Sequence, residues 1–313
     1  MLDVPLLIGG QSCPARDGRT VERRNPVTGE VVSRAAAATL EDADAAVAAA
    51  QAAFPGWAAL APNERRSRLL KAAEHLQARS AEFIAAAGET GAMANWYGFN
   101  VHLAANILRE AASMTTQITG EVIPSDVPGS FAMALRQPCG VVLGIAPWNA
   151  PVILATRAIA MPLACGNTVV LKASESSPAV HRLIGQVLQD AGLGDGVVNV
   201  ISNAPADAAA LVERLIATLR YAGQLHRLDP CRADCRRTLG TSPQAGLAGA
   251  GRQGAVTGAG RRGPGRGGLC GGLWRLLQSG ADLHVDRAPD CRQQDRAGVY
   301  HQAGGQGGNL AGG

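Results

Sequence analysis

Five common residue types are missing from the last third of the 313-residue chain. From Thr218 to Gly313 there is no Ile, Phe, Met, Lys or Glu, although all five occur in residues 1–217. Folded domains do not usually lose five residue types at one point, so we place a boundary at Ala217/Thr218. The C-terminal tail, residues 218–313, is dominated by Gly, Arg, Ala and Gln. Because it is poor in the branched and aromatic side chains that build a core, we expect it to be irregular and disordered.

Paired cysteines are also absent. The seven cysteines form no C-x-x-C pair and have no histidine at metal-ligand spacing, so neither a zinc site nor a disulfide framework is indicated. Cys139 and Cys165 stand among apolar neighbours and are interpreted as small core residues. The net charge of +4 comes from arginines in the C-terminal tail. Its one Trp and two Tyr do not alternate regularly with them, so nucleic-acid binding is the weaker interpretation and no nucleic-acid partner is predicted.

Long apolar runs are missing as well. Residues 1–10 have neither a basic start nor a long apolar stretch, so they do not resemble a signal peptide. The most apolar segment, residues 150–165, is interrupted by Arg157 and Pro162 and is not predicted to cross a membrane. We therefore predict a cytoplasmic protein with no membrane partner.

The first 119 residues are predicted to form a mainly helical region. Short strands are expected around the turns at its start, and Thr39 with Asp42 resembles a capping box that begins an alanine-rich helix. The strands are expected at residues 6–10 and 22–32, and the helices at 40–54, 63–88 and 94–118. Residues 120–138 alternate loosely on either side of 124–129 and predict a hairpin outside the main sheet. Such a hairpin suits contacts between copies of the chain, and an ordinary surface hairpin is the alternative.

Residues 139–217 carry the pattern of half a dinucleotide-binding domain. Two apolar runs rich in branched residues, 141–146 and 168–172, enclose an apolar helical pattern at 152–164. Ser177 and Pro178 then begin a helix to 191, and a strand at 197–201 and a helix to 216 follow. The fold class predicted is α/β, with a doubly wound parallel sheet of which only half is present. Because successive parallel strands end on one edge of such a sheet, we expect a ligand site there.

Polar residues follow both of the first two strands at that edge. No G-x-G-x-x-G fingerprint follows either strand, and P-W-N (147–149) and K-A-S-E (172–175) stand in its place. An amide at a strand end can stabilise a developing oxyanion, which makes Asn149 a candidate. Lys172 and Glu175, three residues apart, can both reach the hydroxyls of one ribose. Taken singly, Asn149 also fits a turn residue, Lys172 with Glu175 a solvated pair, and Trp148 a core residue, but their joint placement favours a site.

At these positions the chain resembles the aldehyde dehydrogenase superfamily. The resemblance covers residues 1–217 and is nearest to the branch that oxidises aromatic aldehydes, vanillin dehydrogenases first and salicylaldehyde dehydrogenases next. It is carried by N-W-Y-G-F-N-V-H (95–102), L-R-E-A-A-S (108–113), L-R-Q-P-C-G-V-V-L-G-I-A-P-W-N-A-P (135–151) and L-A-C-G-N-T-V-V-L-K (163–172).

The resemblance implies an NAD-dependent enzyme that oxidises an aromatic aldehyde and assembles as a dimer or tetramer. In this family a cysteine thiolate attacks the aldehyde, a hydride passes to NAD, and water activated by a glutamate hydrolyses the thioester. A carboxylate near the ribose disfavours the 2′-phosphate of NADP, so Glu175 favours NAD. The implied site consists of Asn149 as the oxyanion-hole amide, Lys172 and Glu175 on the adenosine ribose, and Ile145, Pro147 and Trp148 beside the cofactor.

The C-terminal tail departs from the family pattern. The F-T-G-S-T, E-L-G-G and G-Q-x-C segments, which would contact the pyrophosphate and carry the general base and the nucleophile, do not follow Ala217. The cysteines of the tail have the wrong neighbours, so none is assigned as nucleophile; they are Cys231, Cys235, Cys270 and Cys291. The chain is therefore expected to be catalytically impaired. A non-catalytic NAD-binding or assembly fragment is the alternative.

A change of reading frame accounts for the tail. Residues 223–230, back-translated and read one nucleotide later, allow V-N-F-T-G-S-T. The same offset allows A-L-L-E-L-G-G-K-A from 246–255 and N-Q-G-Q-I-C-M from 278–285. Three motifs at one offset, in the family's order, support the hypothesis of a one-nucleotide frame change close to Ala217.

Overall fold

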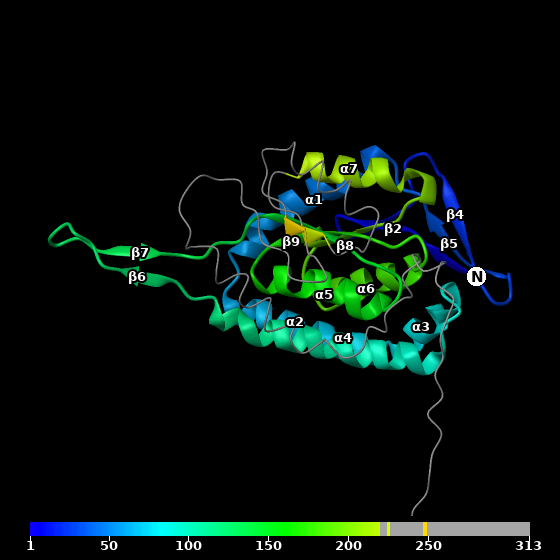
Figure 1. Ribbon diagram of the computed structural model, residues 1–313, viewed down its shortest axis with the longest axis horizontal. Helices are drawn as coiled ribbons and strands as arrows, with labels where there is room; N and C mark the ends of the chain where they lie inside the picture. Colours follow the sequence, from blue (N-terminus) through cyan, green and yellow to red (C-terminus); the bar gives the residue numbers. More distant parts are fainter. Residues whose placement is uncertain (220–223, 226–246, 249–313) are drawn as a thin grey trace, which may run out of the picture. The chain divides into compact units, whose positions relative to one another are not determined.

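A five-stranded sheet forms the centre of the computed structural model, which describes residues 1–219, 224–225 and 247–248 (Figure 1). Its three parallel strands are buried along their whole length, because helices cover both faces. Two antiparallel strands from the N-terminus extend it. In order across the sheet the strands are β3 (Gln11–Cys13), β2 (Leu6–Ile8), β10 (Val198–Ile201), β9 (Thr168–Lys172) and β8 (Val141–Ile145).

Helices cover the two faces of this sheet (Figure 1). Helices α1 and α7 lie on one face, and α5 and α6 lie on the other with α2 and α4 packed beyond them. The predicted doubly wound α/β fold is therefore confirmed. The helices are α1 (Leu40–Ala58), α2 (Pro62–Ala78), α3 (Ser80–Ala85), α4 (Ala94–Met114), α5 (Pro151–Ala164), α6 (Pro178–Asp190) and α7 (Ala208–Thr218).

The N-terminal strands correct the expectation of a purely parallel sheet. Strand β2 pairs antiparallel with β10 and makes the main sheet mixed. Leu6 and Leu7 are fully buried there, which is the reason that this short apolar segment joins the sheet. A separate sheet has the order β1-β5-β4, formed by Leu2–Val4, Val31–Ala36 and Thr20–Arg24.

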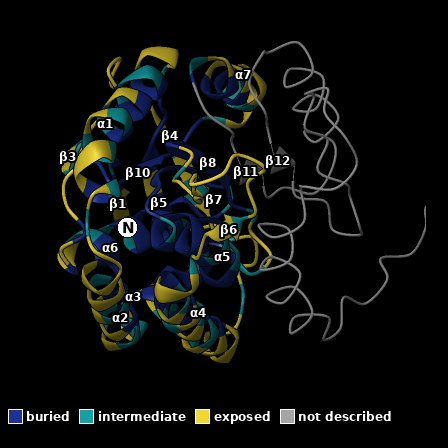
Figure 2. Cartoon of the chain, turned by 90° about the vertical axis from the view of Figure 1, so that its left-hand side faces the viewer, coloured by how far each residue is buried: buried dark blue, intermediate teal, exposed yellow. Residues whose placement is uncertain are grey.

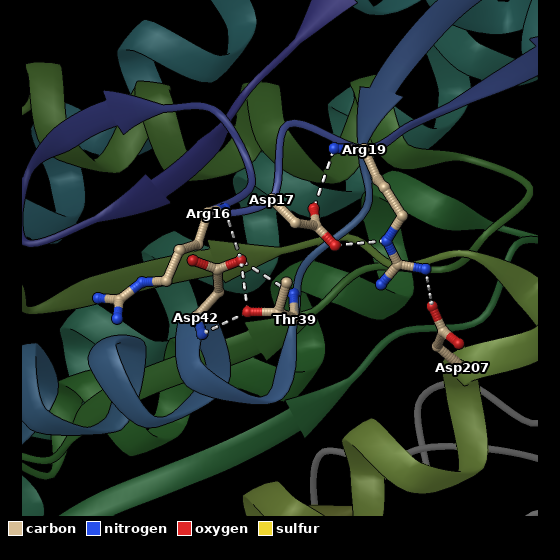
Figure 3. A network of polar contacts seen from close by, with 6 residues as sticks. All are labelled: Arg16, Asp17, Arg19, Thr39, Asp42 and Asp207. Carbon is tan, nitrogen blue, oxygen red and sulfur yellow. Dashed lines mark hydrogen bonds and ion pairs between the residues drawn. The ribbon is translucent and has the colours of Figure 1, made fainter.

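The start of α1 confirms the predicted capping box. The Asp42 amide donates to Oγ1 of Thr39 at 3.2 Å, and the Thr39 amide donates to Oδ2 of Asp42 at 2.9 Å. The same carboxylate accepts from the Arg16 amide at 3.1 Å, while Arg19 pairs with Asp17 and Asp207 in the adjoining network (Figure 3). This network fixes the segment after β3 against the starts of α1 and α7.

Three predicted helix ends are wrong. Helix α1 continues beyond residue 54 through Pro55, which buries Trp57 and lets its Nε1 donate to the carbonyl of Leu163 at 3.1 Å. The single helix expected at 63–88 breaks after Ala78 into α2, α3 and the 3-10 turn η1 (Ala86–Glu89). The break allows both Phe83 and Glu89 to be buried. Helix α4 ends at Met114, and the 3-10 turn η2 (Thr115–Gln117) follows it.

The predicted hairpin is confirmed. Strands β6 (Glu121–Ile123) and β7 (Ala132–Ala134) pair antiparallel and stand away from the central sheet (Figure 1). Figure 2 shows buried residues around the central strands and exposed ones along the outward faces of α1, α2 and α4. The two cysteines interpreted as core residues are not buried: Cys139 is exposed between the hairpin and β8, and Cys165 is half-buried at the end of α5.

The predicted boundary at Ala217/Thr218 falls at the last turn of α7. Beyond it, β11 (Gln224–Leu225) pairs parallel with β12 (Leu247–Ala248). The predictions for the rest of the C-terminal tail, including its four cysteines, lie outside the described residues. Within the described residues, no helix combines the length and the apolar character that crossing a membrane requires.

Candidate functional site

The ends of three parallel strands meet at one edge of the sheet, as the sequence predicts. Ile145 of β8 and Ile201 of β10 both stand opposite Lys172 of β9. Backbone hydrogen bonds continue past the strands, from the Ala146 amide to the Lys172 carbonyl at 3.2 Å and from the Ala173 amide to the Ile201 carbonyl at 2.8 Å. The P-W-N and K-A-S-E segments therefore start side by side.

Lys172 and Glu175 form a buried ion pair at this edge. The side chain of Lys172 is 1% exposed, and its ammonium contacts Oε1 of Glu175, whose side chain is 14% exposed. The interpretation as a solvated pair is thus wrong. A buried ion pair adds little stability over apolar residues of the same size, so its presence at a strand edge favours a role in binding.

Asn203 completes the pair but was not predicted from the sequence. Its Nδ2 donates to Oε1 of Glu175 at 3.3 Å and to the carbonyl of Ala204 at 2.7 Å. Asn203 follows β10 at the same edge where the other two strands end. Its position shortly after the third parallel strand could have identified Asn203 in the sequence, because polar residues at the ends of parallel strands lie close together.

The loop after β9 is held by its own serines and by a buried histidine. The Ser176 amide donates to Oγ of Ser174, and the Ser174 amide donates to Nδ1 of His181 on α6 at 3.0 Å. Burial, helped by the positive charge of Lys172, lowers the pKa of His181 to about 3, so the imidazole is neutral. His181 was not singled out in the sequence, where it is one polar residue on the first turn of an amphipathic helix.

Helix α6 begins as predicted at Pro178, but Ser177 does not cap it with its side chain. The carboxylate of Glu89 takes that place and accepts from the Ala179 amide. A buried carboxylate matches the positive end of the helix more strongly than a hydroxyl does. The capping group was not predictable locally, because it lies on a distant segment.

The P-W-N segment is less enclosed than the K-A-S-E segment. Ile145 is buried and Pro147 is half-buried, whereas Asn149 is exposed and Trp148 is 56% exposed. Trp148 is therefore not the core residue considered as an alternative. The indole Nε1 of Trp96, on α4, donates to the Asn149 carbonyl at 3.4 Å.

An aromatic pair that the sequence analysis did not single out stands beside Asn149. The rings of Trp96 and Phe99 are stacked, with centroids 5.6 Å apart and planes inclined by 23°. Both side chains are exposed. Their positions, three apart on one helix, would have shown that they share a face.

The arrangement suits a ribose better than a metal ion. A carboxylate that accepts and an ammonium that donates, held side by side, match the two hydroxyls of a ribose diol. Among the described residues, no group of three His, Cys, Asp or Glu side chains is placed to hold a metal ion.

Comparison with known proteins identifies the family. Residues 14–218 match the model of the aldehyde dehydrogenase family, and the match ends one residue after the compositional boundary. The chain is 88% identical over 231 residues to a vanillin dehydrogenase from Pseudomonas fluorescens, covering 72% of this chain and 48% of that protein.

Two solved structures share the fold. A salicylaldehyde dehydrogenase from Pseudomonas putida G7, complexed with salicylaldehyde, has a TM-score of 0.76 at 41% identity over 79% of this chain and 51% of that one. An NAD-dependent benzaldehyde dehydrogenase from Corynebacterium glutamicum has a TM-score of 0.73 at 28% identity over 78% and 54%. The chain thus spans about half the length of these relatives. On this similarity in sequence and fold, the chain belongs to the aldehyde dehydrogenase family.

Proposed function

We propose that the chain carries the NAD-binding half of an aromatic aldehyde dehydrogenase, with vanillin as the first candidate substrate. The observation that carries the proposal is the buried Lys172–Glu175 pair, joined by Asn203, at the edge where the parallel strands end. The 88% identity to a vanillin dehydrogenase supports vanillin. Salicylaldehyde is the alternative substrate, supported by the structure that was solved with salicylaldehyde bound.

The roles follow from the chemistry of the side chains. Glu175 accepts from the adenosine ribose hydroxyls and Lys172 donates to them, while Ile145, Pro147 and Trp148 lie beside the cofactor. Asn149 donates its amide to the aldehyde oxygen as negative charge develops there. NAD, when bound, supplies the hydride acceptor. The carboxylate of Glu175 beside a ribose disfavours a 2′-phosphate and favours NAD over NADP.

Cofactor binding is tested by calorimetric titration of NAD into the purified 313-residue chain. Lys172→Met removes a charged donor, so we expect NAD affinity to fall by about 10–100-fold. Lys71→Met is the matched control, since Lys71 is exposed on α2. Unchanged affinity in folded Lys172→Met protein would contradict the proposed ribose contact, and absence of NAD binding by the parent chain would contradict the proposed function.

The chain by itself is proposed to be catalytically impaired by a frame change near Ala217. The sequence has no family segment that supplies the nucleophilic cysteine or the general-base glutamate. Losing a nucleophile typically lowers turnover by at least about 10⁴-fold. The test measures NADH formation from vanillin and NAD beside the Pseudomonas fluorescens relative. Comparable rates would overturn the proposal, as would a gene sequence with no insertion or deletion at this point.

The hairpin supports assembly into a dimer or tetramer. Most large apolar side chains that it carries are exposed, namely Val122, Val127, Phe131, Met133 and Leu135. Several exposed apolar residues on one element are typical of a surface that another protein covers. Sedimentation of the purified chain tests this, with a variant carrying Phe131→Ser and Leu135→Ser expected to remain monomeric. A monomeric parent chain at micromolar concentration would contradict assembly. The cytoplasmic location stays a prediction.

A further inference from the structure

His181 stands between the two loops that carry the candidate site. Its Nδ1 accepts from the amide of Ser174, in the middle of the K-A-S-E segment. The backbone of Pro151, the first residue of α5 and the second after Asn149, also lies close enough to act on the ring. One buried side chain thus contacts the backbone that follows β8 and the backbone that follows β9.

The protonation state of the ring decides what it can hold. Nδ1 accepts a hydrogen bond only when it carries no proton, so the Ser174 contact places the ring proton of the neutral imidazole on Nε2. Nε2 makes no hydrogen bond of standard geometry within the described residues, so the Pro151 backbone acts on the ring only as a close polar neighbour. The Ser174 bond is therefore the stronger of the two contacts.

An apolar side chain at this position could fill the space but could not accept from Ser174. Ser174 is itself buried, so its amide needs an acceptor inside the protein. The neighbours of His181 on the buried face of α6, Val180 and Ile184, are apolar and offer none. The ring also lies close enough to Lys172 and Glu175 for both charges to act on it.

We propose that His181 is a positioning residue of the cofactor site. Its imidazole ties the K-A-S-E loop to the P-W-N loop, and this tie sets the placement of Lys172 and Glu175 relative to Asn149. The inference rests on the proposed function, because it assigns the tie to NAD binding. It adds a residue that touches neither cofactor nor substrate.

Two substitutions separate positioning from packing. His181→Leu fills the space without an acceptor, whereas the Oδ1 of His181→Asn stands close to the place of Nδ1 and can accept from Ser174. We expect His181→Leu to weaken NAD binding by about tenfold, the effect of one lost buried hydrogen bond, and His181→Asn to restore most of it. His102→Leu, at an exposed position on α4, is the control and should leave NAD affinity unchanged.

Amide hydrogen exchange without NAD gives a second readout. His181→Leu should speed exchange in both loops, residues 147–150 and 173–176, while His181→Asn should speed it only in 147–150. Equal NAD affinity for the folded parent, Leu and Asn proteins overturns the inference, and so does unchanged exchange in both loops of His181→Leu. Failure of the parent chain to bind NAD refutes the proposed function instead. In that case, amide exchange measured without NAD still decides whether His181 holds the two loops together.

Discussion

Glu89 accepts the backbone amide of Ala179 with both carboxylate oxygens, at 3.1 and 3.2 Å, across 90 residues of sequence. The contact joins η1 to the first turn of α6, and the hydroxyl of Ser33 donates to the same carboxylate. Helix dipole and hydrogen bonds favour the charged form of Glu89. Burial opposes them and dominates, and it raises the pKa of Glu89 from 4.5 to about 7.

The first prediction is a loss of stability as the pH rises through the range in which Glu89 ionises. The folded chain holds this proton more tightly than the unfolded chain does, so the unfolded state binds fewer protons between pH 4.5 and about 7. The free energy of unfolding should therefore fall by about 3 kcal/mol across that window and stay level above it. Urea unfolding of the parent and Glu89→Gln proteins at several pH values isolates this component as their difference. A difference that does not change with pH would show that Glu89 ionises normally.

The second prediction concerns Gly185 in α6. A Cβ at this position would lie 2.5 Å from Cγ2 of Val200 and 2.9 Å from Cδ2 of Leu7, so the helix could not keep its distance from the sheet. Gly185→Ala should lower the free energy of unfolding by about 1–3 kcal/mol, although alanine favours the helix itself. Gly98→Ala in α4 is the matched control, because no atom lies within 4 Å of its Cβ. It should stabilise the protein by about 0.5–1 kcal/mol in the same urea unfolding assay. Stabilisation by both substitutions would contradict the close packing of α6.

The sequence allowed the strand edge to be predicted because its signals are local. Continuous apolar runs place Lys172 at the end of one strand and Asn149 shortly after another, and the parallel topology brings these strand ends together. The partners of those residues were harder to predict. His181 and Asn203 belong to no motif in the sequence, and such a residue is assigned to a site only when the fold shows what it faces.

The pairing of β2 with β10 and the break in the predicted helix at 63–88 were not predictable from the local sequence pattern. Strand β2 has three residues, too few to indicate that it pairs with β10 some 190 positions later. Residues 63–88 contain helix-forming types throughout, and the break at Arg79 reflects the burial of Phe83 and Glu89 rather than any local signal. Tertiary burial decided both outcomes.

The third prediction concerns Asn167, which joins the base of the hairpin to the end of α5. Its Oδ1 accepts from the amides of Cys139 and Gly140 at 2.6 and 3.1 Å, and its Nδ2 donates to the carbonyl of Pro162 at 3.1 Å. Asn167→Ala leaves these backbone groups without that partner and should cost about 2–4 kcal/mol of unfolding free energy. Asn106→Ala, at an exposed site on α4, should change it by less than about 0.5 kcal/mol. Equal effects in urea unfolding would show that the Asn167 contacts are not stabilising.

The last prediction tests whether Lys172 and Glu175 act as one unit before any cofactor binds. Their contact is buried, where water screens charge weakly, so removing either partner alters the surroundings of the other. Urea unfolding of the parent chain, Lys172→Met, Glu175→Gln and the double variant, without NAD, gives the coupling free energy, expected at about 1–3 kcal/mol. Arg214 and Asp44 form a more exposed pair between α7 and α1, and the same cycle there should give a clearly smaller coupling because water screens the charges. If the two cycles agree, the strand-edge pair is screened like a surface pair, and burial does not hold the ammonium against the carboxylate. A larger coupling at the strand edge means that each group holds the other in place before any cofactor binds, as a preformed ribose site requires.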